Sequence, residues 1–471
     1  MIMNFKFKPV YLLFIVFVST SSVAVQLNHK GLGEVLIYPY YTVNNNLNTL
    51  YSVVNTTADT KAIRVRFLEG DIGIEMSVFN IYLSAFDVWT GALIPGTSTI
   101  SGHLGEPSVI HLTSDTSCAP FLVKSGQEFF SFELDTDLDF DNRSMERSRQ
   151  GYIEVIEMAT FNGWTIPAAD HGTVGVPSDC AAIEADWTDN GIYDTFADEQ
   201  APTGGIFGTA TLVNVAEGLA FSYDAIALQN FWQGGLMHTE PGSLEPNLNS
   251  AFPRSTVLLD NGELNRSEWT QGFQAVSSVL SKYQLINEYA IDGIILGKTE
   301  WVMTFPTKRF HTNNSDQNLL RPFSQAWNGT TSCDEYQLNV YDREEQIEFV
   351  DGNGGPFPQL PLPQFCLSAN VFEFLPPDMS ISDSSSILGS NSHYTITTSS
   401  NAFTESGWGR LEFLDTVTPL PVSGSGLKGL PVTGFAVQQY TNAGAAEGLL
   451  AQYGSLFMHK GLVVTDDEVV D

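Results

Sequence analysis

Four aspartates at alternate positions form the densest group of candidate metal ligands in the chain: Asp135, Asp137, Asp139 and Asp141. On a strand, this spacing places like charges in a row on one face, which is destabilising unless a cation neutralises them. Carboxylate oxygens suit calcium, so the four residues are candidate calcium ligands. The stretch lacks the glycine and the distal glutamate of an EF-hand loop, and a solvated acidic loop is the alternative interpretation. The sequence indicates no other cofactor.

The chain holds four cysteines: Cys118, Cys180, Cys333 and Cys366. No pair has the C-x2-C spacing of a zinc site, and no histidine lies at a matching offset. An even number of cysteines in an exported chain favours two disulfides, and four cysteines allow three pairings. The spacing favours Cys118–Cys180 and Cys333–Cys366, because each pair falls within one half of the chain.

Signatures of catalysis are missing from the sequence, which has no H-E-x-x-H motif, no Walker A loop and no G-x-S-x-G elbow. The eight histidines are scattered. Glu154 and Glu157 lie three positions apart on a predicted strand and therefore face opposite sides. A glycosidase pair of carboxylates could still be assembled across the fold, because spacing in sequence does not give their separation in space. The sequence names no catalytic residue and favours a non-enzymatic protein, but it leaves the enzyme alternative open.

Aromatic side chains suggest a second kind of chemistry, the stacking of sugar rings on exposed faces. The candidates are Trp89, Trp187, Trp232, Trp327 and Trp408. Large aromatic side chains are usually buried for the most part, so a place in the core is the favoured interpretation for each.

The charge and the N-terminus indicate an exported protein. A net charge of −33 repels nucleic acid and argues against binding to anionic membranes. Residues 1–24 read as a signal peptide, with Lys6 and Lys8 before an apolar run at 10–18 and small residues at its end. The apolar run is shorter than the roughly 20 residues of a membrane span. We expect a periplasmic, cell-surface or extracellular protein without a transmembrane anchor, whose partner is a protein or a polysaccharide.

Strands are the elements that must position these residues. Segments 34–43, 49–57, 61–69 and 78–87 read as consecutive strands and predict a β meander that a second sheet covers. In the third segment, apolar residues alternate with Arg64 and Arg66. This alternation is typical of a half-buried strand, and we predict that both arginines point away from the core of their sheet, where they meet acids of another strand or of another subunit. Segment 151–158 is apolar on both faces and predicts a central strand.

The predicted fold is mainly β, with two β-sandwich regions of Ig-like or jelly-roll-like type at residues 25–232 and 298–464. A loop-rich connecting segment at 233–297 joins them. It contains the one predicted helix, at 272–289, where Ala275, Val276, Val279, Leu280, Tyr283 and Ile286 recur at three- and four-residue steps. Residues 465–471 form an acidic tail.

Several phrases together resemble a family of uncharacterised secreted β-rich proteins of Gram-negative, often aquatic, bacteria: GEVLIYPYYT at 33–42, SVVNTT at 52–57, VRFLE at 65–69, YLSAFDVWT at 82–90, GYIEVIEM at 151–158 and TEWVMTFPTKR at 299–309. The resemblance implies an exported β protein and supplies no catalytic residues. We therefore expect a cell-surface or extracellular structural or binding protein. A carbohydrate-binding or carbohydrate-active β-sandwich protein is the alternative.

Overall fold

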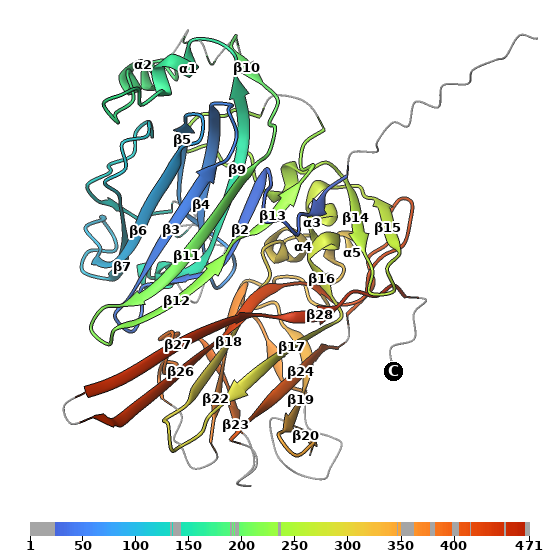
Figure 1. Cartoon of the computed structure of the whole chain (residues 1–471). Coiled ribbons are helices and arrows are strands. Elements are labelled where there is room, and N and C mark those ends of the chain that lie inside the picture. The colour runs from blue at the N-terminus through green and yellow to red at the C-terminus, as the bar shows by residue number, and fades with distance from the viewer. Residues whose placement is uncertain are drawn as a thin grey trace, which may run out of the picture.

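The computed structural model describes residues 24–131, 134, 143–188, 191, 193, 197–233, 237–345, 347–349, 362–376, 382–397, 405–414, 416–446 and 449–466. Within these residues the chain is mainly β, as predicted, with several sheets and a few short helices (Figure 1). No described helix is long and apolar enough to cross a membrane.

The N-terminal half forms two sheets that pack face to face. The β9 sheet has the order β1 (Gln26–Leu27), β13 (Ile226–Gln229), β2 (Val35–Thr42), β9 (Gln150–Phe161), β4 (Lys61–Glu69) and β5 (Glu75–Leu83), and β10 (Glu199–Gln200) pairs with β9. The β3 sheet has the order β12 (Leu219–Asp224), β11 (Ile206–Asn214), β3 (Leu47–Asn55), β6 (Val88–Thr97), β7 (Pro107–Leu112) and β8 (Gln127–Glu128). As predicted, β9 is central, and all twelve of its residues are buried.

The C-terminal half forms two further sheets. The β17 sheet has the order β20 (Ile347–Phe349), β19 (Asp334–Asp342), β24 (Ser406–Phe413), β17 (Gln284–Ala290) and β28 (Lys460–Leu462), with β21 (Gln364–Phe365) paired to β19. The β18 sheet has the order β23 (His393–Thr397), β22 (Ala369–Leu375), β18 (Lys298–Thr304), β26 (Thr433–Ala446) and β27 (Leu449–Met458). Two-stranded pairs are formed by β14 (Arg254–Leu258) with β15 (Leu264–Glu268) and by β16 (Ser281–Lys282) with β25 (Leu430–Pro431).

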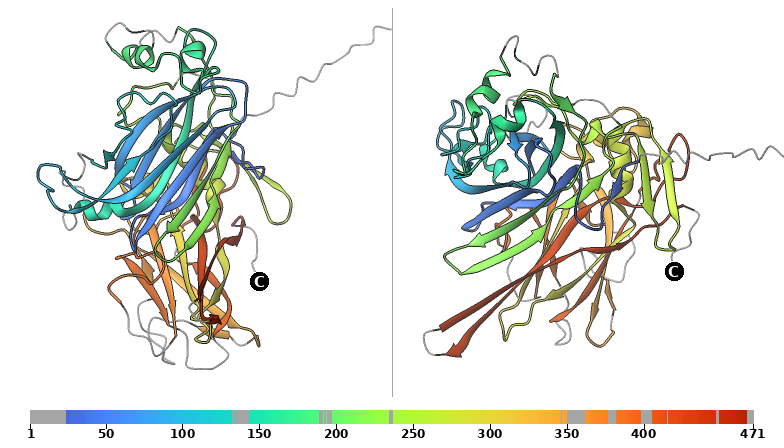
Figure 2. Two further views of the ribbon diagram at one scale, coloured as in Figure 1. Left: turned by 60° about the vertical axis from the view of Figure 1, so that its left-hand side comes forward. Right: turned by 45° about the horizontal axis from the view of Figure 1, so that its top comes forward.

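One hydrophobic core extends across both halves. It contains Leu36 and Val65 of the β9 sheet and Val53 of the β3 sheet, and it continues into Val302 and Val437 of the β18 sheet. The opposite face of the β18 sheet packs against the β17 sheet in a second core. The long hairpin of β26 and β27 runs beside β12, where the two halves contact each other (Figure 2).

The predicted meander is wrong in its pairing, although its four strands exist at nearly the predicted positions. Only β4 and β5 pair as neighbours, whereas β3 belongs to the facing sheet and β2 pairs with β9 and β13. The chain therefore crosses between sheets after β2 and again after β3. Period-2 alternation is a local signal and does not say which sheet a strand joins.

The predicted helix at 272–289 is correct only in its first half. Helix α3 spans Gly272–Leu280, and the chain then turns extended at Ser281 and forms β16 and β17. Leu285 and Tyr289 enter the core between the β17 and β18 sheets at strand spacing. Tyr283 and Ile286 fit a helical stripe by chance. Every residue of α3 is buried, so the helix has no solvent face.

Four more helices, each of four to six residues, lie outside the predicted set: α1 (Thr165–Ala169), α2 (Cys180–Ala185), α4 (Lys308–Thr312) and α5 (Gln317–Leu320). The region of α1 and α2 packs on β5 and β9 through Tyr82, Met158 and Phe161. Together with α3 and residues 231–233 and 237–259, which contact Val35, Ile37 and Ile156, it covers the outer face of the β9 sheet.

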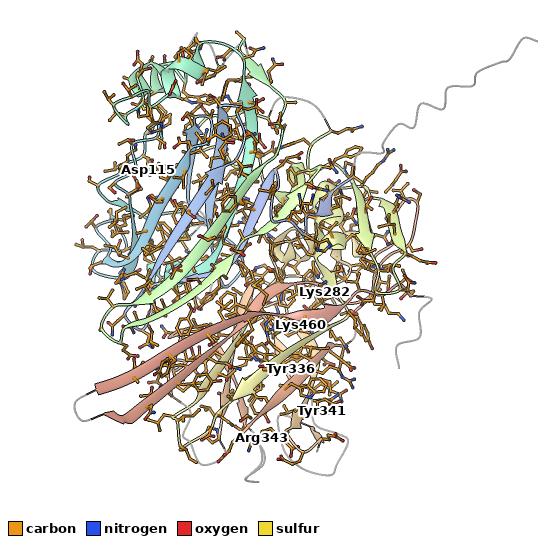
Figure 3. All side chains as sticks on the ribbon, viewed as in Figure 1. Asp115, Lys282, Tyr336, Tyr341, Arg343 and Lys460 are labelled. Carbon is orange, nitrogen blue, oxygen red and sulfur yellow. A yellow bond between two sulfur atoms is a disulfide. The ribbon has the colours of Figure 1, made fainter. Side chains whose placement is uncertain are left out.

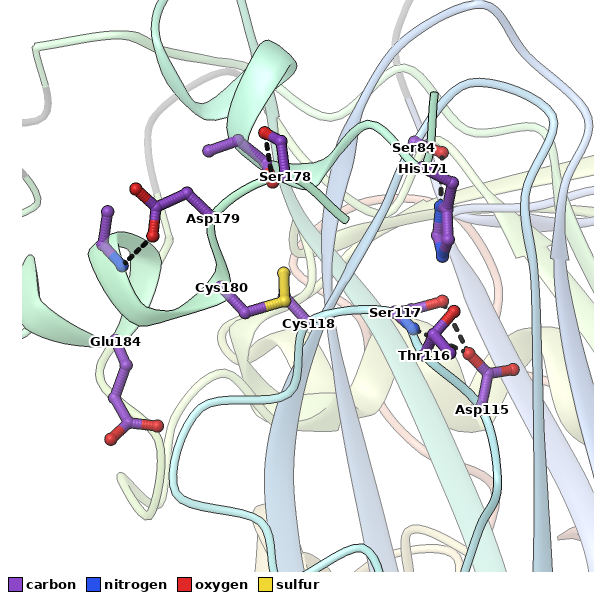
Figure 4. The surroundings of a disulfide bond; sticks show 12 residues. Ser84, Asp115, Thr116, Ser117, Cys118, His171, Ser178, Asp179, Cys180 and Glu184 are labelled. Carbon is purple, nitrogen blue, oxygen red and sulfur yellow. Dashed lines mark hydrogen bonds between the residues drawn. A yellow bond between two sulfur atoms is a disulfide. The ribbon is translucent and has the colours of Figure 1, made fainter. Parts of the chain in front are cut away.

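Both disulfides have the pairing that the sequence spacing favours, Cys118–Cys180 and Cys333–Cys366. The first joins the N-terminus of α2 to the segment that lies beside the edge of β5 (Figure 4). The Tyr82 amide donates to the Cys118 carbonyl at 2.8 Å, so this disulfide fixes the cover of the β9 sheet to the sheet edge.

Candidate functional site

A cavity of about 400 Å³ opens between the edge strands of the two N-terminal sheets, β5 and β8. We call it the β5–β8 cavity. Its walls come from three segments that are distant in sequence, residues 75–79 of β5, residues 120–131 before and after β8, and residues 241–244. Most of its lining is apolar: Met76, Val78, Phe79, Pro120, Phe121, Leu122, Phe130, Pro241 and Leu244. A cavity of this size and character is typical of a ligand site.

Apolar side chains also stand exposed at the rim of the cavity. Phe121 is 58% exposed and Leu244 is 62% exposed. Phe121 has φ = +63°, a left-handed conformation that is rare for a bulky residue and is found preferentially where structure serves function. Cys118 lies two residues before the Pro120 wall, so the Cys118–Cys180 disulfide fixes the position at which this wall begins.

The two carboxylates that line the cavity are both engaged. Glu75 accepts from Arg66 Nε at 2.6 Å. Glu128 accepts from the Thr99 amide at 3.0 Å and the Thr99 hydroxyl at 2.8 Å. Partial burial opposes ionisation of Glu128, but hydrogen bonds from Ser98, Thr99 and Ser108 outweigh it and lower its pKa. A carboxylate with a lowered pKa is a weak proton acceptor, so Glu128 is poorly suited to general base catalysis.

A second cavity, of about 150 Å³, adjoins the first and shares Glu75 and Leu244 with it. Arg66 lines it and forms ion pairs with Glu75 and with Glu154 of β9. Burial lowers the pKa of Arg66, but the two carboxylates raise it by more, so the guanidinium remains charged. The prediction that Arg64 and Arg66 lie on the face opposite the core, and that they meet acids of other strands, is confirmed for Arg66.

The prediction of a half-buried strand is wrong for β4, because both of its faces are buried. Arg64 is fully buried and Arg66 is 5% exposed, because residues 237–250 cover them. Arg64 donates to the Thr239 hydroxyl at 2.8 Å and to the Glu245 carbonyl. Glu154 and Glu157 do face opposite sides of β9, and Glu157 forms a buried ion pair with Lys61 at 2.6 Å.

The candidate calcium ligands Asp135, Asp137, Asp139 and Asp141 lie outside the described residues. Ser131, which lines the β5–β8 cavity, lies four positions before Asp135 in the sequence. Within the described ranges, no three histidine, cysteine or carboxylate side chains are grouped so that they could hold a metal ion.

A chain of three polar groups that resembles a catalytic relay is present, and sequence spacing gave no sign of it. His238 Nδ1 lies 2.6 Å from Glu199, and His238 Nε2 lies 2.8 Å from the Tyr82 hydroxyl. The Trp187 indole donates to the same hydroxyl at 2.9 Å. All three relay side chains are buried, and none lines either of these two cavities.

Of the five candidate tryptophans, two are buried, as the favoured interpretation predicts, whereas Trp187 and Trp327 are partly exposed. Trp89 is fully buried and Trp232 is 9% exposed. Trp408 of β24 differs, because it is 36% exposed and stacks on Tyr341 of β19 with ring centroids 4.1 Å apart. Figure 3 labels Tyr341 in the C-terminal half of the molecule. Arg410 lies beside Tyr341, and Glu288 of β17 is the partner of Trp408 in the register. This outward-facing group is the described place that best suits a sugar ring.

The chain matches no protein-family model, no curated protein and no solved structure. Its function therefore has to be inferred from the geometry of these two places.

Proposed function

We propose that the protein is an exported, non-enzymatic binding protein of the cell surface or extracellular space, and that its ligand occupies the β5–β8 cavity. The observation that carries this proposal is an apolar cavity with exposed Phe121 and Leu244 at its rim, whose carboxylates Glu75 and Glu128 are both engaged. Exposed apolar side chains around a cavity are typical of a binding site.

Export is supported by the signal-like segment at 1–24 and by the two disulfides, which form and persist in oxidising compartments. Fractionation of the native host with an antibody tests it. We expect the protein outside the cytoplasm, and recovery with the cytoplasmic fraction would refute export.

Binding of the neutral dye Nile red tests the cavity. We expect a fluorescence increase that Leu244→Asp weakens several-fold, because the carboxylate opposes entry of an apolar molecule. Val215→Asp is the matched control, since Val215 is 76% exposed in the turn between β11 and β12, away from the cavity. Equal dye binding by both variants would remove the basis for the site.

The alternative function, carbohydrate binding or cleavage, is favoured by the stacked Trp408 and Tyr341. Affinity electrophoresis in gels that contain soluble polysaccharides tests it. Retardation that Trp408→Ala abolishes would support a sugar-binding face, and release of reducing sugar would support an enzyme. Retardation that Trp408→Ala leaves unchanged would exclude this face.

A further inference from the structure

The edge of β5 beside the cavity carries main-chain groups without a partner. The Tyr82 amide donates outward to Cys118, and the Met76 carbonyl accepts outward from the Phe130 amide at 2.8 Å. Because outward and inward groups alternate along a strand, the amide and carbonyl of Val78, four residues before Tyr82 in regular register, also point away from β4. Among the described residues, β5 pairs only with β4, and no hydrogen bond reaches the main chain of Val78 from another segment.

The space beyond Val78 is the β5–β8 cavity itself, which Ser77, Val78 and Phe79 line. At each end the edge is closed, by Cys118 at Tyr82 and by Phe130 at Met76. The stretch between these ends, residues 77–81, is therefore about 17 Å long at ~3.4 Å per residue, and it is recessed between two closed ends. A single extended segment fits such a slot, whereas the edge of a whole folded sheet does not.

The cavity has apolar side chains on both sides of the position that an added strand would occupy. Phe79 and Phe130 lie on the core side, and Val78 and Leu244 lie on the outer side. Successive side chains of a strand point to opposite faces, so both faces of an added segment would find apolar neighbours. Glu128 has no cation paired with it in the described part of the chain, and the net charge is −33, so an acidic segment is disfavoured.

We propose that the β5–β8 cavity binds an extended, neutral or basic peptide segment of a partner protein, which adds as a strand to the edge of β5 at Val78. In strand addition, main-chain hydrogen bonds provide affinity and side-chain pockets provide specificity. This inference rests on the proposed function, because it names the ligand class of the same cavity.

Affinity selection from a pool of random hexapeptides, blocked at both ends, tests the proposal on the full chain. We expect retained peptides that alternate apolar residues and carry no net negative charge. Hydrogen exchange of the Val78 amide should slow at least tenfold when a retained peptide binds. Retention of no peptide would overturn the proposal.

Val78→Pro tests the mode of binding, because proline removes the outward amide but leaves the bonds to β4. We expect the affinity for retained peptides to fall about tenfold or more, as loss of a main-chain hydrogen bond in a dry slot implies. Val78→Thr keeps the amide and should bind within about threefold of the wild type. Equal affinity of the proline variant and the wild type would overturn strand addition.

Two controls separate misfolding and failure of the wider proposal from failure of this one. Ser222→Pro places proline at an outward amide of the other edge strand, β12, and should leave peptide binding unchanged. Nile red binding reports on the cavity independently of peptide binding. If Leu244→Asp weakens dye binding but Val78→Pro leaves peptide affinity unchanged, the binding site is retained and strand addition is rejected. Loss of both signals would reject both proposals. If the wild type is a dimer and Val78→Pro dissociates it, the occupant of the cavity is a second copy of this chain, and the proposal of a partner peptide is overturned.

Discussion

The two N-terminal sheets share a core, but their outer faces differ in solvent exposure and in charge. The outer face of the β9 sheet is covered, and it carries buried charges: Arg64, Arg66 and Glu154. The outer face of the β3 sheet is open to solvent. On strands β12, β11, β3 and β6 this face carries one charged residue, Asp224. Its other residues are Asn48, Leu50, Ser52, Val54, Val88, Thr90, Ala92, Ile94, Phe207, Thr209, Thr211, Val213, Ala220 and Ser222.

This contrast inverts the usual expectation that charged residues mark the exposed face. The alternation in β4 correctly separates the core face from the arginine face. It does not show that residues 237–250, far away in sequence, cover the arginines. Charged residues on one face of a strand therefore identify the face opposite the core. Whether that face is exposed to solvent depends on the tertiary structure. A covered charge then needs a partner, as Arg66 has in Glu75 and Glu154.

The largest effect is expected at the ion pairs of the covered face. Arg66→Met leaves Glu75 and Glu154 buried without their cation, and should lower the free energy of unfolding by about 3–5 kcal/mol. Arg254→Met is the matched control, because the Arg254–Glu268 pair is 43% and 42% exposed and should cost no more than about 1 kcal/mol. Urea denaturation measures both. Equal losses of unfolding free energy in the two variants would mean that residues 237–250 do not shield Arg66 from solvent.

The disulfide that holds the cover should rank next. Cys118→Ser with Cys180→Ser opens a loop with a sequence separation of 62 and should cost about 2–4 kcal/mol. The paired control, Cys333→Ser with Cys366→Ser, has a separation of 33 and lies outside the cover. Hydrogen exchange should rise in α1 and α2 only in the first variant. A rise in both would show that the disulfide does not act on the cover locally.

A smaller, pH-dependent effect is expected at Glu34, which attaches the start of the cover by accepting from the Phe231 amide at 2.6 Å and the Trp232 amide at 3.2 Å. Burial raises the pKa of Glu34 from 4.5 to about 7. Because the folded state holds the proton more tightly, the stabilisation from protonation is complete below pH 4.5 and is lost as the pH rises through 7.

Unfolding of Glu34→Gln as a function of pH tests this sign. Compared with the variant, the wild type should lose roughly 3 kcal/mol of unfolding free energy between pH 4.5 and 8. A constant difference between the two proteins over this range would show that Glu34 titrates normally and that its site is wet.

The smallest effect is expected on the open face. Leu50→Lys, at a position that is 45% exposed, should change the free energy of unfolding by less than about 0.5 kcal/mol. Thermal unfolding at several protein concentrations measures it. A large loss, or a melting temperature that depends on concentration only in the wild type, would show that this face is covered in solution too.

Local features could be predicted from the sequence, and features that depend on distant segments could not. The strand at 61–69 and the hairpin turn between β11 and β12 follow from alternation and from turn residues. The disulfide pairs follow from spacing because each loop closes within one half. The helix at 272–289 was predicted too long because Tyr283 and Ile286 satisfy a helical period while their neighbours satisfy a strand period.

The candidate site left no signal in the sequence. Its walls at 75–79, 120–131 and 241–244 come together only through the sheet edges and the cover. Phe121 and Leu244 are exposed because no distant segment among the described residues covers them, and sequence patterns do not show which segments pack together. Trp408 could be named as a candidate in the sequence, but its stacking on Tyr341 depends on the register of β19 with β24.

The core that both halves share has a consequence for the order in which the chain can fold. Its members range from Leu36 of β2 to Val437 of β26, and Glu300 of β18 accepts from the Leu388 amide at 3.0 Å beside it. During synthesis from the N-terminus, the first two sheets must wait for almost the whole chain before their core is closed. Contacts this distant form slowly and leave apolar surface exposed meanwhile. We therefore expect the nascent chain to expose part of this apolar surface until β26 has been made.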